Sequence, residues 1–132
     1  MYNFEKFTNT GAKLSNYSIS LNPSFSFGFL SGFYNKEGIK NYEKVVLFYD
    51  KDKQAVAFKF TNDLNAEGAF KIVHGKKQST GSTTTRSFII ENDLGKKEYF
   101  GKRIPKRIID NNFGELFVIE LLADEKDNRK SI

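Results

Sequence analysis

The chain has 132 residues, a formal net charge of +5 and no cysteine, which excludes a disulfide framework, a thiolate zinc site and a cysteine nucleophile. This length suits one domain with a real core, and 14 Phe with 6 Tyr make that core aromatic, which favours short strands over long helices. No apolar run approaches the roughly 20 residues that span a bilayer, and the N-terminus lacks the layout of a signal peptide, so we expect a soluble, cytoplasmic protein without a membrane partner.

Two hairpins joined by a short helix are predicted for the first half of the chain. Apolar and small polar residues alternate over residues 17–29 around an Asn-Pro turn, which is typical of a hairpin with one apolar face. Ser31 is placed to cap a short helix, and Gly38 is placed to end it in the left-handed conformation. Residues 45–60 form the clearest hairpin, because two β-prone runs flank a polar turn.

The second half is predicted to repeat this order with a longer loop. Gly95 is placed to close its helix, and Pro105 lacks the backbone donor that a central strand needs, which puts its strand on an edge or at a bulge. The predicted elements are a strand over residues 69–74, a loop over 75–82, a β-prone stretch at 83–85, a helix over 86–93, an extended segment over 98–109 and a hairpin over 107–121.

The similarity of the two halves leads to a prediction of the fold. Placing Asp50 on Asp110 aligns the last hairpin of each half with a one-residue difference in length. We expect a mostly β (α+β) fold, a small barrel or sheet built from two similar strand-strand-helix-strand-strand halves with two short helices. The chain is predicted to form a single domain over residues 1–132, with halves at 14–60 and 69–121 and a charged tail at 122–132. Whether the halves pair within a monomer or between the chains of a homodimer stays open.

The first half also resembles a known family over roughly residues 14–60. The matching order is Ser18 to Leu21, a turn at Asn22-Pro23, Phe25 to Phe29, a helix ending at Glu37-Gly38-Ile39, then Val45 to Asp50 and Val56 to Phe60. This order is similar to the swapped-hairpin barrel of the SpoVT-AbrB family, which includes bacterial transition-state regulators and antitoxins. The resemblance implies that the second half supplies a degenerate copy, so that one chain imitates the family's dimer, as in related cradle-loop barrels.

Two departures limit what the resemblance implies about DNA. Family members carry Gly-Asp ahead of the last hairpin, where this chain has Tyr42-Glu43-Lys44. They carry basic residues around the first turn, where this chain has Asn22-Pro23-Ser24. The resemblance therefore implies the fold, and it does not imply DNA contacts from the first half.

Positive charge is concentrated in residues 71–107, which hold ten Lys and Arg against three Asp and Glu. Cations that neutralise phosphates release counterions, and an aromatic ring stacks on an unpaired base, so this mixture of residues predicts a non-catalytic, regulatory protein that binds DNA or RNA. The candidate contact residues are Lys76, Lys77, Arg86, Lys96, Lys97, Tyr99, Phe100, Lys102, Arg103, Lys106 and Arg107.

The same cations have two other interpretations. Lysines beside a proline on an edge strand keep a sheet from pairing with a neighbour, without any role in binding. Alternatively, the protein is an interaction module, such as an antitoxin-like or inhibitor protein, whose basic face meets an acidic protein partner.

The sequence offers little support for catalysis. His74 is the sole histidine, and the sequence supplies neither a nucleophile nor an orienting carboxylate for it, so an exposed histidine is the simpler interpretation. Asp50 and Asp52 suit a turn better than a metal site, and the loop at residues 75–82 lacks the Gly-Lys-Ser/Thr run of a phosphate-binding loop. We expect no catalytic residue, no metal and no cofactor.

Overall fold

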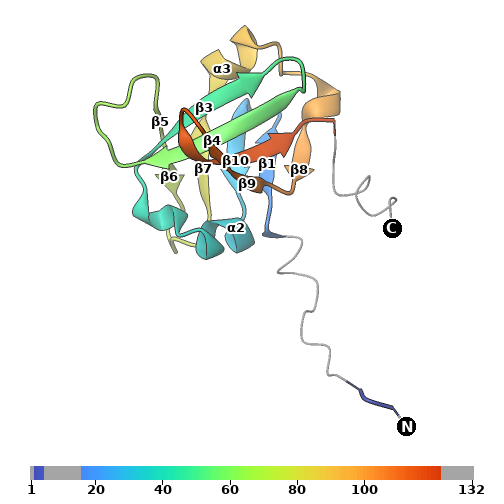
Figure 1. Cartoon of the computed structure of the whole chain (residues 1–132). Coiled ribbons are helices and arrows are strands. Elements are labelled where there is room, and N and C mark those ends of the chain that lie inside the picture. Colours follow the sequence, from blue (N-terminus) through green and yellow to red (C-terminus); the bar gives the residue numbers. More distant parts are fainter. Residues whose placement is uncertain (1, 5–15, 123–132) are drawn as a thin grey trace.

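Two antiparallel sheets of five strands each face one another across an aromatic core (Figure 1). The structure, a computed structural model, describes residues 2–4 and 16–122, so that the predicted charged tail lies outside the described residues apart from Leu122. The fold is mostly β with two short α-helices, as predicted. The sheets do not close into a barrel, so the sheet alternative of the prediction is the correct one.

The strands fall into two groups, here named sheet A and sheet B. Sheet A contains, in spatial order, β6 (Val73–His74), β7 (Gly81–Thr84), β2 (Ser26–Phe29), β1 (Ile19–Asn22) and β8 (Gly101–Arg103). Sheet B contains β5 (Phe70–Lys71), β3 (Lys44–Asp50), β4 (Ala55–Thr61), β10 (Gly114–Glu120) and β9 (Lys106–Asp110). The helices are α2 (Ser31–Lys36) and α3 (Arg86–Glu91), with 3-10 turns η1 (Ile39–Asn41) and η2 (Lys97–Tyr99). The hairpins β1–β2, β3–β4 and β9–β10 confirm the three that were predicted.

Strand pairing follows the same plan in both halves of the chain. In sheet A, β2 pairs with β7 at the centre, and β1 and β6 pair with the outer sides of these two strands. In sheet B, β4 pairs with β10 at the centre, and β3 and β9 lie outside them. Each half therefore contributes one hairpin to each sheet, and an antiparallel pair of inner strands joins the halves in both sheets.

The chain passes from sheet A to sheet B through α2 and η1, and it changes sheet again at two short bends. At the first bend, only Ile72 separates β5 in sheet B from β6 in sheet A. The Ile72 side chain is buried, and its N–H donates to the Glu43 carbonyl oxygen at 2.9 Å. At the second bend, Ile104 and Pro105 separate β8 in sheet A from β9 in sheet B. The strand predicted over residues 69–74 is therefore two short strands in different sheets.

The two α-helices end in the same way, although their sequences differ. The residue two positions after each helix adopts the left-handed conformation, with φ of 65° at Gly38 and 55° at Asp93. The next residue, Ile39 or Leu94, is fully buried. Gly38 was predicted correctly, whereas the residue predicted to close the second helix, Gly95, lies two positions beyond the one that does. Aspartate tolerates the left-handed region better than most residues, which explains the difference.

The start of α2 also differs from the prediction. Ser31 is the first residue of the helix, and Leu30 occupies the N-cap position without a side-chain hydrogen bond. The first backbone donors of a short helix can be satisfied by water at an accessible end. In place of a cap, burial of Phe33 and Tyr34 between the sheets holds α2 in position.

The turns of the two sheet-B hairpins are built alike. The Asp50 carboxylate accepts hydrogen bonds from the N–H groups of the second and third residues after it, at 3.0 and 3.1 Å. The Asp110 carboxylate accepts the equivalent two bonds, at 2.9 and 3.0 Å. Aspartate side chains stabilise turns through such bonds. The alignment of Asp50 with Asp110 made from the sequence therefore pairs residues with the same structural role.

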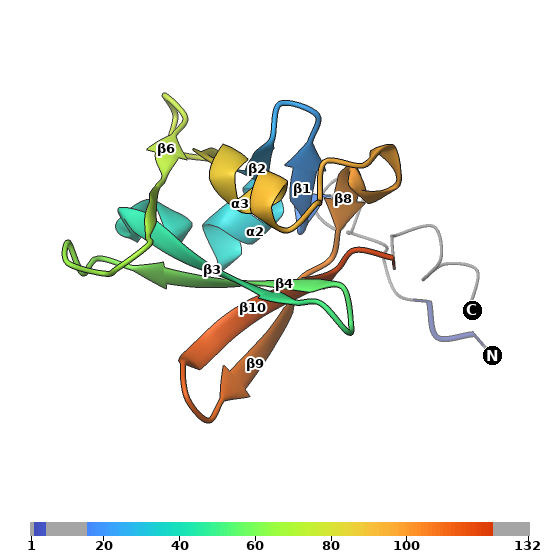
Figure 2. The same cartoon turned by 90° about the horizontal axis from the view of Figure 1, so that it is seen from above.

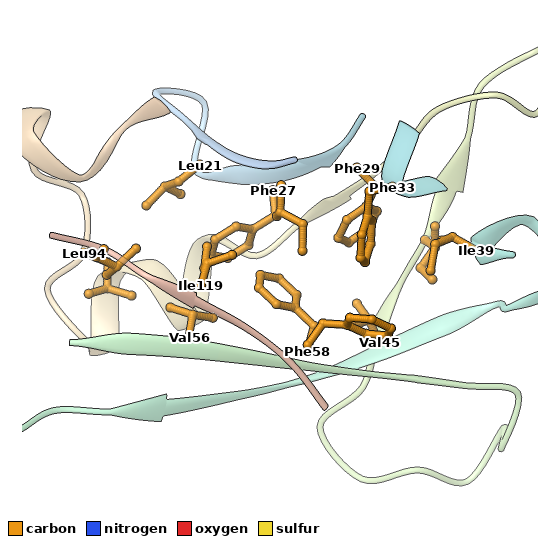
Figure 3. Close-up of a cluster of buried hydrophobic side chains, with 14 of the residues drawn as sticks. Leu21, Phe27, Phe29, Phe33, Ile39, Val45, Val56, Phe58, Leu94 and Ile119 are labelled. Carbon is orange, nitrogen blue, oxygen red and sulfur yellow. The ribbon is translucent and has the colours of Figure 1, made fainter. Parts of the chain in front are cut away.

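The core lies between the sheets and is dominated by aromatic rings (Figure 3). Phe58 is fully buried, and its ring meets the ring of Phe27 edge to face at a centroid distance of 5.0 Å and that of Phe29 at 6.0 Å. These three rings come from both sheets, so they join the two layers. Alternation along β4 and β2 directs these aromatic side chains inward.

Candidate functional site

The predicted basic residues do not gather on one surface. Lys76 and Lys77 lie in the turn between β6 and β7, at one edge of sheet A, whereas Lys102 lies on β8, at the opposite edge. Three strands separate these two edges. Because adjacent strands are about 4.8 Å apart, about 19 Å of sheet lies between β6 and β8. Figure 2 shows the β6 turn and the β8 segment on opposite sides of the molecule.

Arg103 is an interior residue. Its side chain is only 3% exposed, and its guanidinium donates two hydrogen bonds to the carbonyl oxygen of Leu121, from Nε at 3.0 Å and from Nη2 at 2.6 Å. It donates two more to the carbonyl oxygens of Gly101 and Glu98. Arg103 therefore ties the end of β10 to the segment around β8. The prediction that it contacts nucleic acid does not agree with this burial.

The two aromatic residues predicted to stack on bases also serve the interior. Tyr99 is 5% exposed, and its hydroxyl accepts a hydrogen bond from Gln54 Nε2 at 2.8 Å. Phe100 is half-buried and packs against the core. A nucleobase has little access to either ring, so we do not propose that Tyr99 or Phe100 stacks on nucleic acid.

Three of the exposed cations have partners within the protein. Lys96 forms an ion pair with Asp93 at 3.3 Å, and the hydrogen bond to that carboxylate raises the pKa of Lys96. Arg107 forms an ion pair with Glu115 on the neighbouring strand. The Arg86 guanidinium lies over the ring of Phe25, 5.3 Å from its centroid. The ion pairs offset the charges of Lys96 and Arg107, and the Arg86 guanidinium is already engaged with an aromatic ring.

Three exposed lysines remain close together in the sequence near the bend between β8 and β9: Lys97, Lys102 and Lys106. We call them the basic corner. Within the described residues, none of the three forms an ion pair. The basic corner contains predicted contact lysines that stay accessible at the β8 and β9 edges of the two sheets, with Lys102 on sheet A and Lys106 on sheet B.

An apolar groove, which the sequence did not reveal, lies on the outer face of sheet B. The strand register places Phe48, Ala57, Val118 and Lys106 side by side across four strands on this face. The ring of Phe113, from the β9–β10 turn, lies 4.5 Å from that of Phe48 between centroids. The groove has a volume of about 600 Å³, and we call it the sheet-B groove. Its apolar lining is formed by Phe48, Ala57, Ile108, Phe113, Leu116 and Val118, with Lys53, Asp50, Asp110 and Glu120 also at its walls.

Exposed apolar side chains concentrate in and around β9, the strand at the edge of this groove. Ile104, Ile108, Ile109 and Phe113 are 45, 41, 65 and 46% exposed, and all lie in or next to β9. Large apolar residues that cluster on a surface are typical of interaction sites. A sequence signal was present, because a phenylalanine is unusual in a turn of the type Asn-Asn-Phe-Gly.

His74 has a structural role and is half-buried, in contrast to the exposed position predicted for it. Its Nε2 lies 2.8 Å from the Tyr42 carbonyl oxygen, which only accepts, so Nε2 carries the proton. Nδ1 then accepts from the Tyr34 hydroxyl at 2.6 Å. Burial raises the pKa of Tyr34, which keeps that hydroxyl protonated. Both ring nitrogens are thus engaged.

The carboxylates provide no evident metal centre. Asp50 is occupied by its turn, and within residues 2–4 and 16–122 no group of three or more His, Asp and Glu side chains is placed to hold a metal ion. Asp50 therefore has the turn-forming role expected of it.

Neither a membrane-spanning helix nor a matching protein family points to the role of this chain. No helix in the described part of the chain has the length and apolarity that crossing a membrane requires. The resemblance to the SpoVT-AbrB family stays a prediction. Comparisons with protein-family models, curated proteins and solved structures find no match to this chain.

Proposed function

We propose that this protein is an interaction module that binds another polypeptide through the outer face of sheet B. The observation that supports this proposal is the sheet-B groove with its exposed apolar border. Burying apolar surface is the main favourable term in protein association, and exposed Phe and Ile side chains around a concave surface provide it. The candidate contact cations, in contrast, are spread over α3, both edges of sheet A and β9 of sheet B.

The charged residues around the groove indicate the kind of polypeptide segment that it would bind. Lys53 and Lys106 lie at its walls, and so do Asp50 and Asp110. Mixed charges at the rim of an apolar surface favour a segment with apolar residues at its centre and charges of both signs at its ends. This differs from the wholly acidic partner that the basic character of the chain suggested.

The test compares protein partners retained by three forms of the full chain. Phe113→Ser removes an exposed ring from the groove, and Ile90→Ser removes a 55% exposed apolar side chain on α3, away from the groove. We expect a partner identified by mass spectrometry to bind the wild type and Ile90→Ser equally, and to bind Phe113→Ser about tenfold more weakly, which corresponds to about 1.4 kcal/mol. Equal binding to all three forms, or no specific partner, would contradict the proposal.

The basic corner favours a second candidate function, the binding of nucleic acid. The proposal is that Lys97, Lys102 and Lys106 contact phosphates, with Arg103 left out because it is buried. Affinity for a single-stranded oligonucleotide should then fall with salt, with a log-log slope of about −0.7 for each phosphate contact. Changing the three lysines together to Glu should abolish binding.

A matched control makes this second test specific. Lys71, Lys76 and Lys77 are also exposed, and changing them together to Glu alters the net charge by the same amount at the other edge. We expect this control to keep most of the affinity. If both triple variants lose binding equally, the attraction is a property of net charge, and the basic corner is not a site.

A further inference from the structure

We infer that β9 pairs with β9 of a second copy of this chain, so that two sheets B join into one continuous sheet. Among the described residues, β9 pairs only with β10, and its other edge is open. Figure 2 shows β9 at the end of sheet B, extending away from the core. An open edge strand presents unpaired N–H and C=O groups that another strand can complete. This inference rests on the proposed interaction function and names the partner of this edge.

The residues of β9 complement themselves when two copies run antiparallel. With Ile108 opposite Ile108 at the centre, Lys106 lies opposite Asp110 of the other copy, and this pair occurs twice. Arg107 then lies opposite Ile109, also twice. Opposite charges facing each other across antiparallel strands contribute about 0.2 to 1 kcal/mol per pair. When the second copy runs antiparallel, Lys106 and Asp110 of one strand therefore face the opposite charges of the other strand.

Other arrangements of the same strands lose this match. A parallel, in-register pair opposes Lys106 to Lys106 and Asp110 to Asp110, which are like-charge contacts. An antiparallel pair centred on Arg107 opposes two guanidinium groups. Like charges directly opposite each other destabilise a sheet, so the charges disfavour both of these arrangements, and the register centred on Ile108 is favoured because it pairs Lys106 with Asp110 twice.

The surface around β9 is suited to this contact. Ile108 is 41% exposed on the groove side of the strand, and Ile109 is 65% exposed on the other side. Pairing covers apolar surface on both faces of the new sheet. Lys106 on the edge deters an unrelated apolar strand, because pairing with it would leave its charge without a partner. A second copy supplies that partner through Asp110, whereas Arg107 keeps its ion pair with Glu115.

The expected assembly is a symmetric dimer of modest affinity. A contact in which each surface meets the same surface of its twin closes after two copies, so it forms no longer fibre. Pro105 at one end of β9 and the turn after Asp110 at the other limit the pairing to five residues. Interfaces of such small area belong to the weak, reversible class.

The test uses a charge exchange between two variants of the full chain, followed by sedimentation velocity over a range of concentrations. Lys106→Glu places like negative charges opposite each other in a dimer of that variant. Asp110→Lys does the same with positive charges. When the two variants are mixed, both cross-strand pairs become complementary again. We expect the wild type to dimerise, each variant alone to dimerise at least about tenfold more weakly, and the equimolar mixture to regain dimers.

Two further variants keep the test decisive. Lys51→Glu alters the net charge equally in the other sheet-B turn and should leave dimerisation unchanged. Ile108→Lys introduces like charges at the two-fold centre, so it should abolish the dimer even if Asp110→Lys weakens its own turn and fails to fold.

Two results would overturn the inference. One is a wild type that sediments as a monomer at every concentration, which would show that the charges of β9 serve only to block pairing. The other is a dimer that persists in both Lys106→Glu and Ile108→Lys, which would place the contact elsewhere. A monomer that still binds a different protein through the sheet-B groove would refute the pairing and leave the proposed function intact. A dimer that binds no other protein would support the pairing and refute the proposed function.

Discussion

Replacing Phe58 with alanine is expected to lower the free energy of unfolding by about 4 kcal/mol, the range found when a buried aromatic ring is removed. Phe58 is fully buried, and its ring contacts rings from both layers of the fold. Its loss leaves a cavity where the two sheets meet. Because domains of this size are stable by only about 5 to 15 kcal/mol, much of the stability would be lost.

Urea denaturation followed by circular dichroism measures this effect. The matched control is Ile90→Ala, which truncates a side chain that is 55% exposed on α3. An exposed substitution of this kind should change stability by no more than about 0.5 kcal/mol. Equal losses in the two variants would mean that the sheets are not held together by the aromatic core.

Replacing Arg103 with methionine is expected to destabilise the protein by about 3 kcal/mol, because the Leu121 carbonyl group, which accepts two buried hydrogen bonds, and two part-buried carbonyl contacts then lose charged donors. The guanidinium reaches Leu121, Gly101 and Glu98, three carbonyl groups in two segments of the chain. Methionine fills a similar volume and donates nothing. Arg103→Lys should lie between the wild type and Arg103→Met, because a compact ammonium cannot reproduce the planar fork of donors.

The neighbouring residue provides the control for this second prediction. Lys102→Met removes the same charge one position away, but Lys102 is exposed on the outer side of β8. Its effect on the midpoint of urea denaturation should be within about 0.5 kcal/mol. If Lys102→Met costs as much as Arg103→Met, the net charge and not the hydrogen bonds of Arg103 is responsible.

The parts of the fold that the sequence predicted are those governed by local physics. Alternation of apolar residues and the chemistry of turns are short-range, so the hairpins around Asp50 and Asp110 were located to within a few residues. The bend at Ile72 was missed, because no breaker residue marks it. What produces the bend is pairing of its two flanking strands in different sheets: β5 pairs with β3, which is distant in the sequence, and β6 pairs with β7, which follows it after a turn.

The candidate site was less predictable, for a related reason. A run of cations in the sequence does not specify which side chains point inward, and period-two alternation along β8 places Lys102 outside and Arg103 inside. The separation of Lys76 from Lys102 depends on the order of strands across sheet A, which the local pattern does not contain. The sheet-B groove likewise exists only because two hairpins from different halves lie side by side.

The central pairs β2–β7 and β4–β10 have a consequence for how the protein can be divided. Each takes one strand from either half, and β1–β8 and β3–β5 also join strands of different halves. A cut in the connection at residues 62–69 would therefore leave two fragments with unpaired strand edges in both layers and half of a core. We expect neither fragment to fold alone, because each presents strand edges that the other completes. The chain can therefore be regarded as two halves that depend on each other for folding and are linked by residues 62–69.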